Sequence, residues 1–290
     1  MRHHLPPRHV PAAAGSASAP LVRGAARTGR VVATTRLAAF IEMDDPPPER
    51  GDVADQPAVL ALIDPEAVRL PCSLVLSEPL PPLHNGAVAV LGADRVCVGG
   101  MRISPSRWWR VPRPALSRPG DAVTRAATIT SLPDADVLPT EVATASTRLM
   151  SALNSPDDDL IAAVGGLLGL GPGLTPAGDD VLAGALVALS GTAPDRRARL
   201  ADAVAANEPA RRTTVVSAAL LRHAATGECI PELADLMAAL DGREDLPSAH
   251  RRLLEVGHTS GPALALGAVH ALSTQFADMQ FATAHRRIAL

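Results

Sequence analysis

Short apolar runs separated by turn residues dominate the first part of the chain. Between residues 21 and 119 these runs include RVVATTRLAAFIEM, PAVLALI, SLVLSE, GAVAVLG and DRVCVGG, and segments such as DDPPPERGD and EPLPPLHNGA separate them. Short apolar runs bounded by turn residues are typical of β-strands. We therefore predict a β-rich domain over residues 21–135, built as a small sheet or barrel, with a tight turn at HNG, residues 84–86.

After residue 139 the apolar positions recur at helical spacing. Examples are TEVATASTRLMSAL, DDVLAGALVAL, IPELADLMAALDG and GPALALGAVHALS. The segment SPDDDLIAAVGGLLGL starts with a serine, a proline and three acids, and such a start is favourable because acids stabilise the positive end of a helix dipole. We predict about seven or eight short helices, which form an all-α domain over residues 136–290.

The predicted fold class is α+β, with a β-rich N-terminal domain followed by a helical C-terminal domain. Residues 1–20 are rich in proline, alanine, serine and glycine, and we expect them to be a disordered lead-in. The pair Trp108–Trp109, flanked by arginines, is either a ligand surface or a packing pair at a strand edge.

Composition narrows the possible functions. The chain has three Phe, two Trp and no Tyr, so alanine and leucine must fill the core. All 27 basic residues are arginine, and the absence of lysine excludes a Schiff-base mechanism and a Walker-type phosphate loop. The net charge is −3 and the arginines are scattered along the chain, so the sequence shows no basic patch for nucleic-acid binding.

The cysteines and the hydropathy of the chain indicate where in the cell the protein is expected to be. The three cysteines are far apart and form no CxxC motif, which suits buried thiols in a reducing compartment. The N-terminal segment lacks the apolar core of a secretory signal, and no apolar run approaches the ~20 residues of a membrane span. We expect a soluble, cytoplasmic protein with neither a membrane nor a nucleic-acid partner.

The first candidate site is the segment GLGPGLTPAGDDVLAG, residues 169–184. Its glycines permit positive φ and close backbone approach, and a rigid loop that enters a helix N-terminus can bind an anion. The candidate binding residues are Gly171, Gly173, Thr175 and Gly178. Asp179 and Asp180 would repel an anion unless they accept a proton, bind a metal or hold a positive group. The alternative is a turn between helices in which Asp179 is the N-cap.

Two further clusters also lie at predicted helix starts. RRTTVVSAALLRHA, residues 211–224, has hydroxyl groups on one helix face, and GHTSGPALALG, residues 257–267, has a histidine beside two hydroxyls. The candidate binding residues are Thr213, Thr214, Ser217, Thr259, Ser260 and Gly261, and His258 is a candidate acid or base. The alternative for each cluster is simple capping, by Thr213 in the first. Together, the three helix starts predict one pocket for a phosphate or carboxylate.

The segments GLGPGLTPAGDD, RRTTVVSAALL and EVGHTSG, in this order and spacing, resemble the AllH-type subunit family of oxamate carbamoyltransferase. The resemblance covers chiefly residues 160–275. It implies a subunit of a multi-subunit enzyme of allantoin and purine breakdown, which converts oxalurate and phosphate to oxamate and carbamoyl phosphate. The implied partners are an acyl-CoA-synthetase-like subunit and a third subunit.

Two hypotheses follow for the function. In the first, the chain is catalytic: Asp179 and Asp180 orient a substrate amide or bind a divalent cation such as Mg²⁺, the hydroxyls stabilise the anion, and His258 moves a proton. In the second, the chain is a non-catalytic anion-binding or assembly subunit. The second hypothesis draws on Pro262 and Ala263, which stand where the family tends to carry an acid.

Overall fold

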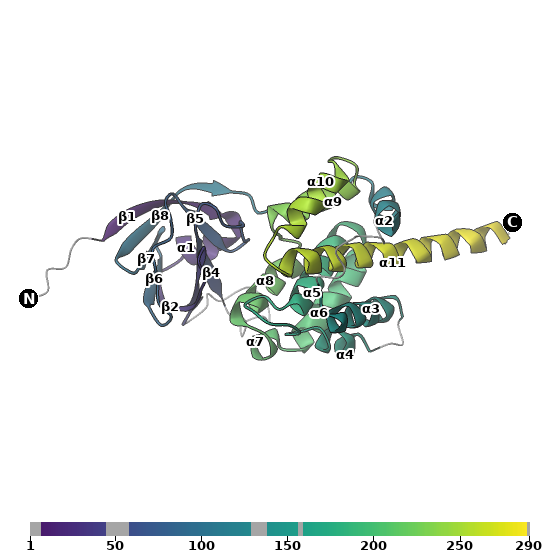
Figure 1. Ribbon diagram of the computed structural model, residues 1–290, viewed down its shortest axis with the longest axis horizontal. Helices are drawn as coiled ribbons and strands as arrows, with labels where there is room; N and C mark the ends of the chain where they lie inside the picture. The colour runs from purple at the N-terminus through teal and green to yellow at the C-terminus, as the bar shows by residue number, and fades with distance from the viewer. Residues whose placement is uncertain (1–6, 45–57, 129–137, 156–158, 289–290) are drawn as a thin grey trace, which may run out of the picture. The chain divides into compact units, whose positions relative to one another are not determined.

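The computed structural model describes residues 7–44, 58–128, 138–155 and 159–288, and the chain divides into two compact units, Met1–Val111 and Pro112–Leu290 (Figure 1). The first unit is β-rich and the second is helical. The expected order of a β-rich part followed by a helical part is therefore confirmed.

The first unit is a closed barrel of eight strands, in the order β1-β5-β4-β3-β2-β6-β7-β8. Neighbouring strands are antiparallel except for the β1–β8 and β4–β5 pairs, which are parallel. The bounds are β1 Arg8–Gly15, β2 Arg27–Thr34, β3 Ala38–Met43, β4 Val59–Ile63, β5 Ser73–Leu76, β6 Val88–Gly92, β7 Arg95–Val98 and β8 Met101–Trp109. A short 3-10 turn, Ser16–Ser18, and helix α1, Ala19–Arg23, follow β1.

Alternating side chains fill the barrel interior. In β2 the buried positions alternate with exposed or half-buried ones, and the core includes Val31, Ile41, Leu62, Leu91 and Ile103. A barrel of eight strands is narrow enough for its own side chains to fill it. The expected turn at residues 84–86 is also confirmed, since the Ala87 N–H donates to the His84 carbonyl and Gly86 has a φ of +86°.

The expected disordered lead-in over residues 1–20 is wrong for its described part. Strand β1 pairs with β5 on one side and with β8 on the other, and it thereby closes the barrel. Its side chains Val10, Ala12 and Ala14 are buried. Alanine and proline carry little strand propensity, so the pairing partners, not the local sequence, make this segment a strand. Residues 1–6 lie outside the described residues.

The second unit contains ten helices in the described residues, more than the seven or eight expected. Their bounds are α2 Pro119–Thr128, α3 Thr140–Asn154, α4 Leu160–Gly165, α5 Ala177–Thr192, α6 Pro194–Ala206, α7 Pro209–Arg212, α8 Val215–Ala225, α9 Pro231–Leu240, α10 Leu246–Leu254 and α11 Ser260–Ile288. No helix in the described part of the chain combines the length and the apolar character that a membrane span requires.

Helix α2 places the boundary between the units earlier than residue 135. It packs against α9 and α11, and the preceding segment is tied to the end of α9, because Asp241 accepts hydrogen bonds from the Ser117 hydroxyl and the Arg118 N–H. These contacts place the segment from Pro112 onward in the helical unit. The expected acidic helix start at residues 156–158 lies outside the described residues, but Asp159 caps α4 by accepting the Ala162 N–H.

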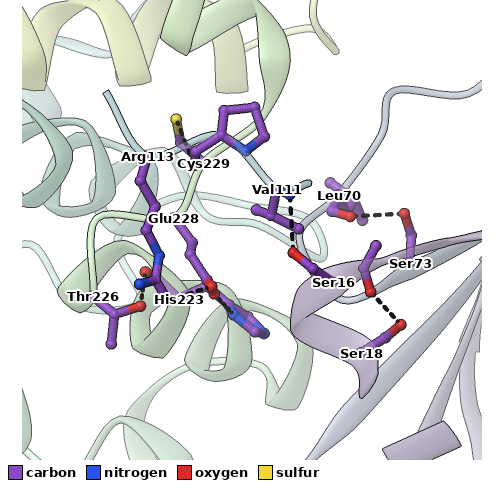
Figure 2. A network of polar contacts seen from close by, with 12 residues as sticks. Ser16, Ser18, Leu70, Ser73, Val111, Arg113, His223, Thr226, Glu228 and Cys229 are labelled. Atoms are coloured by element: carbon purple, nitrogen blue, oxygen red, sulfur yellow. Dashed lines mark hydrogen bonds and ion pairs between the residues drawn. The ribbon is translucent and has the colours of Figure 1, made fainter. Parts of the chain in front are cut away.

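A second polar network ties the α8–α9 connection to the start of the helical unit. Glu228 accepts a hydrogen bond from Arg113 at 2.7 Å and pairs with His223 Nδ1 at 2.7 Å, and Thr226 donates to the His223 carbonyl (Figure 2). Within the barrel unit, Figure 2 also shows the Ser16 hydroxyl accepting the Val111 N–H after β8. Each network fixes an end of its own unit.

Helices α5 and α11 form the closest helix pair of the second unit. A Cβ added to Gly184 on α5 would lie 2.1 Å from the Leu264 carbonyl oxygen, and one added to Gly267 on α11 would lie 2.0 Å from the Val181 carbonyl oxygen. Such distances leave room only for hydrogen, so the two backbones touch directly. This crossing requires the small residues in which the sequence is rich, and it fixes the start of α5 beside the start of α11.

We predict that Gly267→Ala lowers the free energy of unfolding by about 2 kcal/mol, because a methyl group at this crossing forces the two helices apart. Urea denaturation followed by circular dichroism measures the change. Gly166→Ala is the matched control, since a Cβ there would make an ordinary contact at 3.5 Å with the Ala163 carbonyl oxygen. Equal stability of the two variants would contradict the close crossing.

Candidate functional site

The glycine-rich loop between α4 and α5 is held in a tight conformation. Gly171 and Gly173 have φ of +112° and +98°, so their positions favour glycine. At Gly178 the constraint is space, because an added Cβ would lie 2.0 Å from the Leu167 carbonyl oxygen. The expectation that these glycines permit positive φ or close backbone approach is confirmed, and their role as binding residues stays a prediction.

Asp179 is buried in the first turn of α5 and bonds to three groups of other segments. Its side chain is 2% exposed, and its carboxylate accepts the Gly169 N–H at 2.7 Å, the Ser217 hydroxyl at 2.7 Å and the Thr213 hydroxyl. The N-cap of α5 is Pro176. The alternative in which Asp179 caps its own helix is therefore wrong, and its carboxylate instead joins the loop to α8.

Thr214, not Thr213, caps α8. The Thr214 hydroxyl accepts the Ser217 N–H at 3.0 Å and donates to the Leu174 carbonyl at 2.5 Å. The alternative in which Thr213 is only a cap is therefore wrong, because its hydroxyl binds Asp179. The start of α8 thus contacts both the loop and the first turn of α5.

Asp180 faces the start of α11. Its side chain is 7% exposed, and the hydroxyls of Ser260 and Thr175 act on it as hydrogen-bond donors. These two hydroxyls also lie 3.0 Å from each other. Asp180 Oδ2 is buried and accepts no hydrogen bond within the described residues. A buried carboxyl oxygen without a partner is costly, and it indicates that a group outside the chain completes the site.

The three predicted clusters therefore meet at the start of α5. Asp179 contacts the cluster at residues 213–217, and Asp180 contacts the cluster that begins α11. Both aspartates are buried and face away from bulk solvent. His258 lies apart from this contact: its side chain is exposed in the turn before α11, with Thr259 half-buried beside it.

The backbone N–H groups at these helix starts are less available than the sequence suggested. The Gly178 N–H donates to the Leu170 carbonyl at 2.9 Å, and the Gly261 N–H donates to the Val256 carbonyl at 2.9 Å. A Cβ on Gly261 would lie 1.9 Å from the Leu253 carbonyl oxygen, so this glycine permits a tight turn between α10 and α11. The Asp180 carboxyl group, rather than these two amides, is left to meet a ligand.

Burial and hydrogen bonding give the two aspartates different protonation states. Burial raises the pKa of Asp180 to about 8; the hydroxyls of Ser260 and Thr175 oppose this rise, and the charge of Asp179 adds to it. Burial also raises the pKa of Asp179, but three hydrogen bonds to its carboxylate offset part of the rise. Because Asp179 has the fuller set of donors, we assign the negative charge of the pair to Asp179 and the proton to Asp180.

These residues do not form a set of metal ligands. Within the described residues, no group of three or more His, Cys, Asp or Glu side chains could hold a metal ion. Both oxygens of Asp179 already accept hydrogen bonds, which leaves a single free oxygen on Asp180. Mg²⁺ needs near-octahedral oxygen coordination, and one carboxyl oxygen does not supply it. We therefore derive no step through a divalent cation.

Two parts of the site were not among the predicted residues. The Gly169 N–H binds Asp179, and a φ of +77° at Gly169 turns this amide toward it. The Arg212 guanidinium donates to the Gly165 carbonyl at 2.9 Å and to the Asn207 side chain, which anchors the start of the loop. The glycine pattern LGLGPG was a usable signal for Gly169, but nothing in the local sequence indicates the Arg212 contacts.

The fold and the site define a mixed α/β protein, with an eight-stranded barrel and a helical unit that holds a buried polar site. Residues 167–272 match the family described as oxamate carbamoyltransferase subunit AllH, which confirms the resemblance expected from the three motifs. This segment contains the aspartate pair and all three helix starts. No solved structure matched the chain.

We predict that Asp180→Asn stabilises the protein at pH 8 but not at pH 4. With a folded-state pKa of about 8 and an ordinary value of 3.8, the folded state binds a proton that the unfolded state has lost. The stability that this proton supplies is full below pH 3.8 and is lost as pH rises to about 8. Asparagine removes this dependence, so the free energy of unfolding of the variant at pH 8 should exceed that of the wild type by roughly 5 kcal/mol.

Urea denaturation at both pH values tests this prediction. Glu141→Gln, at an exposed position on α3, controls for the loss of one acidic group. A wild-type protein whose stability relative to Asp180→Asn is the same at pH 4 and pH 8 would contradict the assigned protonation of Asp180.

Proposed function

We propose that this chain is a subunit of an oxamate carbamoyltransferase, which converts oxalurate and phosphate to oxamate and carbamoyl phosphate in allantoin and purine breakdown. The observation that carries the proposal is Asp180 Oδ2, a buried oxygen without a partner inside the segment that matches the AllH family. Such an oxygen marks the place where a small polar ligand completes the site.

The chemistry of carbamoyl transfer suits the groups around Asp180. A phosphate oxygen attacks the carbamoyl carbon of oxalurate and the phosphate loses one proton. The bond between the carbamoyl carbon and the oxamate nitrogen then breaks, and that nitrogen takes up one proton, so the reaction consumes no net proton. Negative charge develops on the carbamoyl oxygen before the bond breaks, and neutral hydrogen-bond donors stabilise it. The neutral Asp180 carboxyl is such a donor, and its contacts with the hydroxyls of Thr175 and Ser260 orient it.

Asp179 serves this site as a positioning residue. Its hydrogen bonds to Gly169, Thr213 and Ser217 fix the first turn of α5 relative to the loop and to α8. Because Asp180 is the next residue on the same turn, its direction depends on these contacts. Catalytic groups must be held to within a fraction of an ångström, which gives the Asp179 contacts a role in the reaction rate.

His258 is the group proposed to exchange protons with the solvent. Its imidazole is exposed two residues before Ser260, whose hydroxyl belongs to the Asp180 cluster. An imidazole carries and releases protons near neutral pH more readily than other side chains. Thr259 and Gly261 form the turn that holds His258 next to the start of α11.

The partners are proposed from the family description, which names a subunit. We propose that this chain acts together with an acyl-CoA-synthetase-like subunit and a third subunit. The substrates are small anions, and neither nucleic acid nor a membrane is proposed as a partner.

Replacing both aspartates with asparagine is the test of the catalytic proposal. We expect the double variant Asp179→Asn, Asp180→Asn, assembled with the partner subunits from the native host, to form carbamoyl phosphate at least about 100-fold more slowly than the wild type. The reason is that the variant loses the contacts by which Asp179 positions the site and the proton that Asp180 carries. Glu141→Gln is the control variant, and circular dichroism verifies that both variants are folded.

Retained activity of the double variant would contradict the catalytic proposal and favour a non-catalytic anion-binding or assembly subunit. One observation fits that second function: every oxygen of Asp179 is satisfied within the chain, so the loop is fixed in shape without a ligand. Co-purification of the partner subunits with the double variant, compared with the wild type, would then measure its role in assembly.

A further inference from the structure

We propose that the site at Asp180 binds its anionic ligand together with one proton, which Asp180 Oδ2 donates to an oxygen of the ligand. This inference rests on the proposed function and deepens it, because it specifies how a site that contains two carboxyl groups accepts an anion. The ligand class is a small anion with an oxygen acceptor that reaches Oδ2.

One oxygen of the Asp180 carboxyl group is left without a hydrogen-bond partner, whereas the hydroxyls around it have partners. Asp180 lies in the first turn of the 16-residue helix α5 and is 7% exposed, and its Oδ2 is buried without a partner. The hydroxyls of Thr175 and Ser260 are engaged with the carboxyl group and with each other. The hydrogen-bonding position left without a partner in this cluster is therefore at Oδ2.

The charges around Asp180 make a proton necessary for anion binding. On its own helix, Asp179 is the charged group whose field acts on Asp180. The elements packed against this turn face it with hydroxyls. Thr175 lies in the loop and Ser260 in α11, while Thr213, just after α7, and Ser217, in α8, bond to Asp179. An anion beside two carboxylates would meet two negative charges. Protonation of Asp180 removes one charge and turns Oδ2 from an acceptor into a donor.

The arginine that anchors the start of the loop already has partners of its own. The Arg212 guanidinium bonds to the Asn207 side chain and to the Gly165 carbonyl. The chain has no lysine, so an ammonium group cannot neutralise the pair. The positive end of the α5 dipole favours an anion at this place, and the proton on Asp180 supplies the remaining compensation.

The protonation state of Asp180 agrees with this role. Burial raises its pKa to about 8, so the proton is in place at neutral pH before the ligand arrives. Below about pH 7, binding should not depend on pH. Above about pH 8 the free protein loses the proton, binding must recover it, and the affinity should fall by about tenfold per pH unit.

Isothermal titration calorimetry of the full-length chain with oxamate tests this coupling from pH 6 to pH 9.5. The carboxylate of oxamate stays ionised over this range, so the probe itself does not titrate. We expect a constant Kd below about pH 7, a rise of about tenfold per unit above pH 8, and uptake of about one proton per oxamate at pH 9, measured in buffers of different ionisation enthalpy.

Two variants test whether Asp180 carries the proton that is coupled to binding. Asp180→Asn keeps a neutral donor that does not titrate, so its affinity for oxamate should be independent of pH from 6 to 9.5. His258→Gln should keep the full pH dependence. Wild-type binding that is flat to pH 9.5, pH-dependent binding by Asp180→Asn, or no oxamate binding at any pH would each overturn the inference.

The same measurements distinguish this inference from the proposed function. A complex that forms carbamoyl phosphate while oxamate binding is independent of pH overturns the proton coupling alone. A complex without transferase activity, whose chain nevertheless binds oxamate with proton uptake, overturns the proposed reaction and leaves the coupling in place.

Discussion

The direct backbone contact between α5 and α11 sets the geometry around the aspartate pair. Gly184 and Gly267 let each helix touch a carbonyl of the other, so the two helix starts cannot drift apart without opening a packed interface. Ser260 is held beside Asp180 for this reason. The two glycines at this crossing are therefore a requirement of the site as well as of helix packing.

Two consecutive aspartates perform different tasks because consecutive positions on a helix point about 100° apart. Asp179 faces α8 and the loop, and it is satisfied by three donors. Asp180 faces α11, and it keeps one oxygen without a partner. The first carboxyl group makes the structure rigid, and its charge contributes to holding a proton on the second. Positioning and ligand contact are thus divided between neighbours that the sequence alone presents as an equivalent pair.

Much of the fold and of the site could be predicted, and the failures have physical causes. Apolar runs bounded by turns revealed most strands of the barrel, and the glycine-rich loop revealed the place where the helix starts meet. Strand β1 was missed because alanine and proline give no local strand signal, and its pairing with β5 and β8 is non-local. The capping roles considered as alternatives for Asp179 and Thr213 are wrong, since spacing along the chain cannot show that these two side chains meet each other.

The position of the two tryptophans at the end of β8 has a spectroscopic consequence. Both Trp108 and Trp109 belong to the barrel unit, where the Arg23 guanidinium lies 4.2 Å from the Trp108 ring centroid, and the chain has no tyrosine. Intrinsic fluorescence above 290 nm therefore comes from the barrel alone, whereas most of the helical circular dichroism comes from the other unit. The two signals follow the two units separately in one sample, without any label.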